Sequence, residues 1–181
     1  MKYLIASDIH GNAAACEKLI AYYENNGFDR LVLLGDLLYH GPRNNLPGSY
    51  DVKRVYEMLN RHAAEILSAR GNCDSDVDQK VLEFPCKAEY FIFAEGGKCY
   101  FATHGDRYNC GHLPPILGVD VLLTGHTHVP ACENHIDYIY CNPGSAGIPK
   151  GGSCCSFMTL EGNHLEWHSL EDGHVYMQTE L

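Results

Sequence analysis

Apolar runs and helical patterns alternate along the first 72 residues of the chain. The run at 3–6 predicts a buried strand, and the apolar positions between 13 and 23 recur at the spacing of one helical face. Asn12 can cap this helix and Gly27 can end it. Such alternation is typical of βαβ units, so this part of the chain is predicted to form a mainly parallel sheet.

Two further apolar runs, at 30–36 and 65–72, continue the alternation. Between them, the segment 39–50 is rich in Gly, Pro and Asn and predicts a loop. Asp51 follows this loop and can cap a helix whose apolar positions from 52 to 59 fall on one face. The two runs are therefore predicted to add a second and a third strand to the same sheet.

The pattern changes after residue 72, where strands follow one another without helices. Residues 88–106 contain two apolar runs joined by Glu95, Gly96 and Gly97, which predicts an antiparallel hairpin with a tight turn. Further strands are predicted at 119–128, 138–141, 153–160 and 164–168. An α/β half followed by a strand-rich half predicts one domain, residues 1–181, of two sheets packed face to face with helices outside.

The polar residues at the ends of the apolar runs carry the candidate chemistry. Five separate runs each end in Asp, Asn or His, and the residues are Asp8 and His10, Asp36, Asn72, His104, and His126 and His128. In α/β sheets the carboxyl ends of the strands line the ligand crevice, so these side chains are predicted to converge. Any one alone would be an ordinary surface residue, but unpaired polar groups at five buried strand ends would be costly.

The spacing and type of these residues suit metal coordination. Asp8 and His10 lie two residues apart, as do His126 and His128, and on extended backbone each pair would point to one side, about 7 Å apart at Cα. The neighbouring glycines permit turns that bring backbone close to an ion, and they are Gly11, Gly35, Gly71, Gly105 and Gly125. Asp, Asn and His without Cys suit Mn, Fe, Zn or Ni, and seven ligands are too many for one such ion. Two ions about 3.5 to 4 Å apart, sharing the carboxylate of Asp36, would use them all.

Composition narrows the possible partners. The 181 residues include 13 basic and 23 acidic side chains, a net charge of −10 without a basic cluster, which argues against a long nucleic acid but not against a small phosphorylated molecule. No apolar run is long enough for a signal peptide or a membrane span, which predicts a cytoplasmic protein without a membrane partner. The nine cysteines contain no CxxC pair and are predicted to be reduced thiols in small apolar sites.

The motifs at the strand ends resemble those of the calcineurin-like metallophosphoesterases, specifically the small YfcE-type phosphodiesterases of bacteria and archaea. The motifs are DIHGN, GDLLYHGP, GNCD, THGDRY and GHTHVP, in this order, followed by NPGSAGIP. The resemblance implies a four-layer α/β/β/α sandwich of two mixed sheets with a dinuclear metal site at its edge. It also implies that one ion is held by Asp8, His10, Asp36 and His128, and the other by Asp36, Asn72, His104 and His126.

A site of this kind implies an enzyme that hydrolyses small phosphate diesters. Two divalent ions, with manganese expected first and iron, zinc or nickel as alternatives, would lower the pKa of a bridging water. The resulting metal-bridging hydroxide would attack phosphorus in line with the leaving group. A phosphomonoesterase, a nucleotide pyrophosphatase and a metal-binding protein-interaction scaffold of the same fold stay open as alternatives, and so does a homo-oligomer.

Three consecutive residues after the third predicted strand, Asn72, Cys73 and Asp74, are candidates for catalysis. Larger relatives have His in place of Cys73, and that His is credited with stabilising the transition state or protonating the leaving group. A thiol is a weak hydrogen-bond donor and carries no positive charge. Small YfcE-type proteins commonly have the same cysteine, so the chain is predicted to be active and best on esters whose leaving group needs little protonation.

Two loops are predicted to form the walls of the substrate pocket, at 39–50 and at 106–115. In the first of them, His40 and Arg43 are candidates for binding the phosphate or the leaving group. Specificity in this family lies in such loops, and the sequence does not identify the leaving group.

Overall fold

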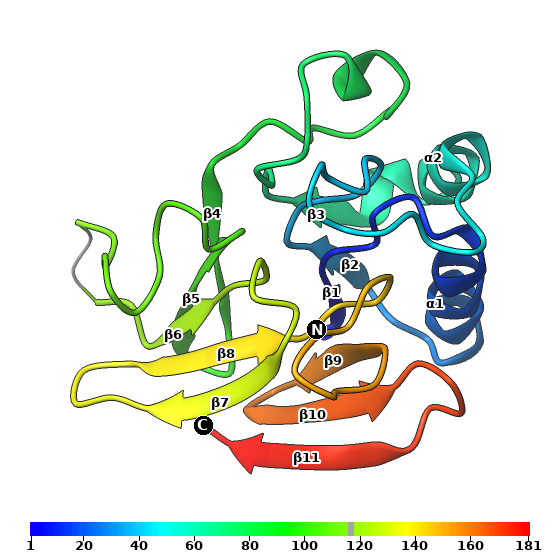
Figure 1. The fold of residues 1–181 in the computed structure, drawn as a ribbon. Coiled ribbons are helices and arrows are strands. Elements are labelled where there is room, and N and C mark those ends of the chain that lie inside the picture. The colour runs from blue at the N-terminus through cyan, green and yellow to red at the C-terminus, as the bar shows by residue number, and fades with distance from the viewer. Residues whose placement is uncertain (116–117) are drawn as a thin grey trace.

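The computed structural model of the protein describes residues 1–115 and 118–181 (Figure 1). Its strands are β1 (Lys2–Ala6), β2 (Arg30–Leu33), β3 (Ile66–Ser68), β4 (Tyr90–Glu95), β5 (Lys98–Thr103), β6 (Val121–Leu123), β7 (Pro130–Asn134), β8 (Ile139–Pro143), β9 (Ser156–Glu161), β10 (His164–Ser169) and β11 (Val175–Glu180). Its helices are α1 (Ala13–Asn25) and α2 (Val52–Asn60), with short 3₁₀ helices η1 (Ala63–Glu65) and η2 (Asp78–Lys80).

The strands form two mixed sheets. The six-stranded sheet has the order β11-β10-β9-β1-β2-β3, in which β1, β2 and β3 are parallel and β9, β10 and β11 pair antiparallel to their neighbours. The five-stranded sheet has the order β4-β5-β6-β8-β7, with β5, β6 and β8 parallel and an antiparallel strand at each edge. The carboxyl ends of five parallel strands, from both sheets, therefore lead into the loops that carry the predicted site.

Alternation along β1 explains how the layers pack. Leu4 and Ala6 face α1 and α2, whereas Tyr3 and Ile5 face the other sheet, as the period of two along a strand requires. The layer between the sheets also contains Trp167, which is fully buried and donates its indole N–H to the carbonyl of Asn142 at 2.7 Å. Two apolar layers, one under the helices and one between the sheets, thus fix the edge at which the loops meet.

The predicted sandwich of two mixed sheets is confirmed, with a difference in one outer layer. Within the described ranges, both α-helices lie on the six-stranded sheet (Figure 1). On the outer face of the five-stranded sheet, Tyr108 and Val119 from the segment between β5 and β6 pack on Phe101 and Leu122 instead of a helix. This segment contains Gly111, Pro114 and Pro115, which disfavour helix.

Helix capping follows the sequence prediction, and two strands were missed by it. The Asn12 side chain accepts a hydrogen bond from the amide of Ala15 at 3.1 Å, and Asp51 accepts one from Arg54 at 3.1 Å. Strands β7 and β11 lie at sheet edges and have no fully buried residue, so they lack the alternating apolar pattern of a half-buried strand. In the described part of the chain, no helix has the length and apolar character needed to cross a membrane.

The described cysteines are all free thiols, as predicted. Cys16, Cys86 and Cys141 are buried in apolar surroundings, but Cys110 and Cys154 are exposed, so the prediction that all nine occupy apolar sites was too broad.

Candidate metal centre

Loops from both sheets meet at one edge of the sandwich, and the predicted ligands lie in them. The loop after β1 runs beside the loop after β2, where the amide of Asp8 donates to the carbonyl of Gly35 at 3.1 Å and that of His10 donates to Asp36 at 2.9 Å. The amide of His126, after β6, donates to Oδ2 of Asp8 at 3.0 Å and joins the two sheets. Parallel pairing thus continues past the strand ends and brings the loops together.

The backbone of the ligand loops differs from the sequence prediction. Five residues other than glycine have positive φ in the described ranges, between 50° and 66°, and all are predicted ligands: Asp8, His10, Asp36, His126 and His128. The prediction that the paired ligands lie on extended backbone was therefore wrong. A left-handed conformation costs a non-glycine residue roughly 1–2 kcal/mol, and such strain concentrates at functional sites. The fold therefore contains five strained residues, and the strained backbone directs their side chains into the site.

The strain is testable at His126, which is only partly buried. In the metal-free protein, His126→Gly is expected to be more stable than His126→Ala by about 1 kcal/mol, because glycine adopts positive φ without a steric penalty. Urea unfolding of both variants measures the difference. The control is Ala14→Gly on the exposed face of α1, where the same exchange of alanine for glycine should destabilise by about 1 kcal/mol. Equal stability of the two His126 variants would contradict the interpretation.

Three histidines are oriented by backbone carbonyls. The Nδ1 of His10 lies 2.7 Å from the carbonyl oxygen of Tyr39, that of His104 lies 2.7 Å from Leu34, and that of His128 lies 2.5 Å from Ile148. A carbonyl only accepts, so each Nδ1 carries a proton and Nε2 is the ring nitrogen that points into the site. This arrangement, with the second ring nitrogen held by the protein, is typical of metal-ligating histidines.

One group of donors surrounds Oδ1 of Asp8. This oxygen lies 3.3 Å from Nε2 of His128 and 3.5 Å from Nε2 of His10, and the two Nε2 atoms are 3.3 Å apart. Oδ1 is buried and has no hydrogen-bond partner. Ligand atoms bound to one ion at about 2.0–2.2 Å lie at roughly these mutual distances. A divalent cation among these three residues would satisfy the unpaired oxygen and both lone pairs, so the residues present fit a metal ion.

A second group of donors lies on the other side of Asp36. Oδ2 of Asp36 is 3.6 Å from Nε2 of His10 and 3.5 Å from Nε2 of His104. The same nitrogen of His104 is 3.1 Å from Oδ1 of Asn72 and 3.2 Å from Nδ1 of His126. Asp36 is therefore the carboxylate that faces both groups. The structure brings all seven predicted ligands into two adjoining clusters, and geometry of this kind could hold two ions.

Charge inside the site favours cations. Burial would lower the pKa of His104, but the hydrogen bond with Asp36 and the charges of Asp8 and Asp36 outweigh it and raise the pKa to about 9. Burial would likewise raise the pKa of Asp36, but contact with His104 and with the amide of Cys73 outweighs it and lowers the pKa to about 2. A proton and a metal ion compete for Nε2 of His104, so the carboxylates that hold the proton would also attract the metal.

Asp74 holds the loop that carries Asp36. Its carboxylate is buried and accepts three backbone N–H groups, from Asp36 at 2.9 Å, Leu37 at 2.9 Å and Gly71 at 2.7 Å. These bonds occupy the oxygens that a general acid or base would need free. The geometry supports an orienting role for Asp74, which the sequence analysis named as a candidate for catalysis.

Cys73 lies next to the ligands. Its amide donates to Oδ1 of Asp36 at 2.7 Å, and its sulfur accepts from Nδ2 of Asn72 at 3.2 Å, which leaves Oδ1 of Asn72 facing His104. Through these two contacts Cys73 helps to position Asp36 and Asn72. Burial, followed by the charge of Asp36, raises the pKa of the thiol to about 12, although bound cations would act in the opposite direction.

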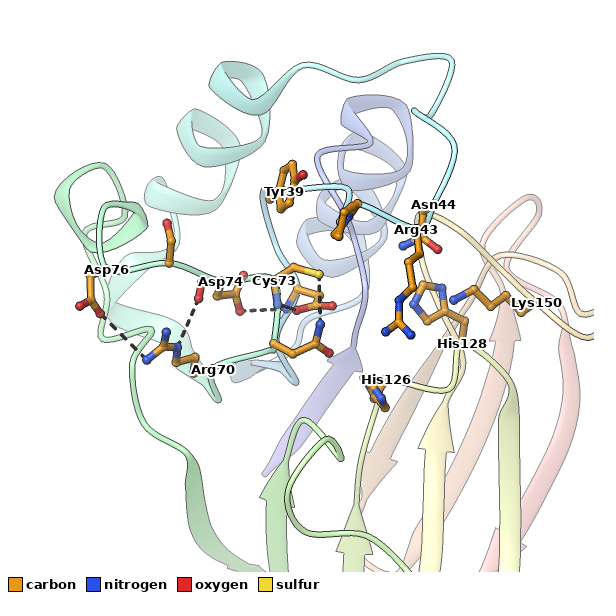
Figure 2. Close-up of a pocket in the computed structure, with 15 residues that line it drawn as sticks. Tyr39, Arg43, Asn44, Arg70, Cys73, Asp74, Asp76, His126, His128 and Lys150 are labelled. Carbon is orange, nitrogen blue, oxygen red and sulfur yellow. Dashed lines mark hydrogen bonds and ion pairs between the residues drawn. The ribbon is translucent and has the colours of Figure 1, made fainter.

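A cavity of about 850 Å³ opens over the two clusters (Figure 2). It is lined by Asp36, Tyr39, Gly41, Pro42, Arg43, Asn44, Arg70, Asn72, Cys73, Asp74, Ser75, Asp76, His126, His128 and Lys150. Arg43 lines it, as predicted for a substrate contact. His40 does not, because its ring packs edge-on against Tyr50, with ring centroids 5.4 Å apart.

The second wall of the cavity also differs from the prediction. The segment 70–76 forms it, whereas of the segment 106–115 only Asp106 and Arg107 line a smaller cavity of about 240 Å³ that shares Arg70 and Asn72 with the first. Lys150 was missed as well. It directly follows the motif NPGSAGIP, and its backbone bond to the carbonyl of His128 places it next to the ligands.

Comparison with known proteins gives matches over nearly the whole chain. The sequence matches the calcineurin-like phosphoesterase superfamily domain over residues 1–164. It is 40% identical over 181 residues to phosphodiesterase YfcE of Escherichia coli K12, covering 100% of this chain and 98% of that protein. It is 25% identical over 171 residues to phosphodiesterase MJ0936 of Methanocaldococcus jannaschii, covering 88% of this chain and 87% of that protein.

Solved structures give the same result. The structure of YfcE, a phosphoesterase from E. coli, superposes with a TM-score of 0.95 at 40% identity and covers 99% of both chains. Vps29 of Entamoeba histolytica, in a complex with Zn²⁺, superposes with a TM-score of 0.66 at 22% identity and covers 99% of both chains. The second similarity concerns the fold alone, whereas the first extends to sequence over the full length.

Proposed function

This chain belongs to the calcineurin-like phosphoesterase superfamily and is a hydrolase of phosphate esters, and we propose that its substrates are small phosphate diesters, cleaved at a centre of two divalent metal ions. The observation that carries this proposal is the pair of donor clusters that share Asp36. We propose that all 181 residues form one domain around this centre.

The residues divide between the two ions according to the clusters. Asp8, His10 and His128 would hold one ion, Asn72, His104 and His126 the other, and Asp36 both. Manganese is the expected metal, since oxygen and imidazole donors without thiolate suit it. When bound, the ions would supply an activated water and neutralise charge on the phosphoryl oxygens.

The protein's own contribution is orientation. The carbonyl groups of Tyr39, Leu34 and Ile148 hold the imidazoles in place through Nδ1, so that Nε2 points into the site. Asp74 fixes the backbone of the Asp36 loop through three amides, and the amide of Cys73 holds Oδ1 of the Asp36 carboxylate. The cavity then presents one open side to a diester, with Arg43 on its wall.

Cys73 is a poor proton donor for a departing alcohol. Of the residues that line the cavity beside the ligands, Cys73 occupies the position where larger relatives have His, and a neutral thiol donates weakly. Diesters with acidic alcohols, such as nitrophenols, depart without help and are therefore the expected substrates.

Cys73→His is expected to raise turnover of diesters with poor leaving groups by about 10-fold or more, and that of a nitrophenyl diester much less. The reason is that an imidazolium can protonate the leaving oxygen. A leaving-group series measured on the manganese-loaded enzyme tests this, with Cys154→His, at an exposed position outside the cavity, as the control. An equal effect across the series would contradict proton donation.

Kinetics on a matched pair, bis(p-nitrophenyl) phosphate and p-nitrophenyl phosphate, tests the substrate class. We expect kcat/KM to favour the diester. A clear preference for the monoester would replace the proposal with a phosphomonoesterase, and absence of turnover of both by metal-loaded protein would favour a scaffold.

A further inference from the structure

Two cationic side chains stand together on one wall of the cavity. Arg43 comes from the loop after β2 and Lys150 from the loop between β8 and β9, and Figure 2 shows both next to His128. Both are exposed, and neither has an ionic partner within the part of the chain that the structure describes. We call this pair the rim cations.

On the opposite wall, in contrast, the cation lies near a carboxylate. Asp76 pairs with Lys87 at 2.8 Å and lies 4.0 Å from Arg70, whose Nε donates to the backbone carbonyl of Asp74 at 3.2 Å. Figure 2 shows Arg70 and Asp76 across the cavity from the rim cations. Among the described residues of the lining, Arg70 thus has a carboxylate within 4.0 Å, whereas neither of the rim cations has one.

The positions of the rim cations are fixed by backbone bonds. The amide of Lys150 donates to the carbonyl of His128 at 3.1 Å, and Ser153 donates to the carbonyl of Lys150 through Oγ at 2.7 Å and N at 3.1 Å. Beside Arg43, the Asn44 side chain donates to the carbonyl of His40 at 2.8 Å and closes the loop. Each cation therefore starts from an anchored backbone, and only its side chain needs to adjust to a ligand.

The charge and size of the cavity indicate what the rim cations bind. In a protein with a net charge of −10, two unpaired positive groups on one wall repel each other unless an anion lies between them. A diester phosphate carries one negative charge, which the metal centre would already neutralise. A volume of about 850 Å³ is in the range that accommodates ligands much larger than one phosphate. The cavity therefore has enough volume, and the rim cations enough unpaired positive charge, to bind a second anionic group.

We infer that the rim cations bind a second phosphate group of the substrate, so that the preferred substrates are phosphate diesters in which one alcohol carries a phosphomonoester. Arginine binds phosphate through two parallel N–H donors and lysine adds a point charge, and together they match the charge of a phosphomonoester near −2. This inference rests on the proposed diesterase function and specifies its substrate class.

Two synthetic diesters separate the inference from the function on which it rests. Both release p-nitrophenol, and the second alcohol is propanol in one and 3-phosphopropanol in the other. For the manganese-loaded enzyme, we expect a KM about 10- to 100-fold lower for the phosphorylated diester, with kcat similar, as the strength of charged hydrogen bonds suggests. The preference should weaken as the salt concentration rises, because the pair is exposed.

Substitutions of the rim cations test whether they cause the preference for the phosphorylated diester. Lys150→Met and Arg43→Gln are each expected to raise KM for the phosphorylated diester at least about 5-fold more than for the propyl diester. Lys53→Met, at an exposed lysine of α2 that pairs with Glu57, should keep the wild-type preference. If the wild type hydrolyses neither diester, the proposed function fails. If it hydrolyses both with the same KM, or if the rim variants affect both diesters equally, the inference is overturned while the function stands.

Discussion

Replacing Asp36 with asparagine is expected to lower kcat/KM for a nitrophenyl diester at least about 100-fold. Even residues that only support a ligand commonly contribute 10- to 100-fold, and Asp36 faces both donor clusters. The amide keeps an oxygen that can accept from the amide of Cys73, but it removes the one negative charge placed between the two clusters. The expected loss is therefore electrostatic and not due to unfolding.

Steady-state kinetics together with metal analysis of the purified Asp36→Asn protein measures this. Metal content should fall with activity, while the metal-free protein stays folded with a lower unfolding midpoint, because an amide does not pair with a protonated His104. Asp137→Asn, at an exposed carboxylate between β7 and β8, serves as the matched control and should retain full metal content. Full activity of Asp36→Asn would show that this carboxylate is not shared by two ions.

Gly71→Ala is expected to destabilise the metal-free protein by about 3 kcal/mol or more and to abolish activity. A Cβ at this position would overlap the carboxylate and the backbone nitrogen of Asp36, and backbone atoms in a packed loop have little freedom to move. Because Gly71 also donates its N–H to Asp74, displacement would disturb the residue that fixes the Asp36 loop.

Denaturant unfolding and diester kinetics on the same preparation test this expectation. Gly48→Ala is the matched control, since a Cβ there meets no atom within 4 Å and its φ is not in the left-handed region. We expect it to change stability by a few tenths of a kcal/mol at most. If Gly71→Ala were as stable and active as Gly48→Ala, the close approach of the two loops would not be required.

The sequence predicted the sheets and the convergence of the candidate ligands because both follow from local patterns. Apolar runs located β1, β2 and β5, and the polar residue after each run was a donor that the structure brings to the edge. Ligand backbone conformation was not predictable in this way. Positive φ at residues such as Asp8 and His126 arises from pairing between loops that are far apart in the sequence, and no propensity indicates it.

The cavity wall was predicted less well than the centre, for a related reason. His40 and Arg43 share one loop, but the ring of His40 turns toward Tyr50 while Arg43 faces the cavity, a choice made by packing. Lys150 belongs to no motif of metal ligands and reaches the site only because its backbone bonds to His128. The position of such side chains relative to the site depends on tertiary packing and not on sequence spacing, so it can be determined only from the folded structure.

The most direct test of the dinuclear centre is to titrate chelator-treated protein with Mn²⁺ while following both bound metal and hydrolysis of bis(p-nitrophenyl) phosphate. We expect no turnover without metal and a rise in turnover that is complete only when two ions are bound per chain. Turnover that survives chelation, or that reaches its maximum with a single bound ion, would contradict the two-ion centre.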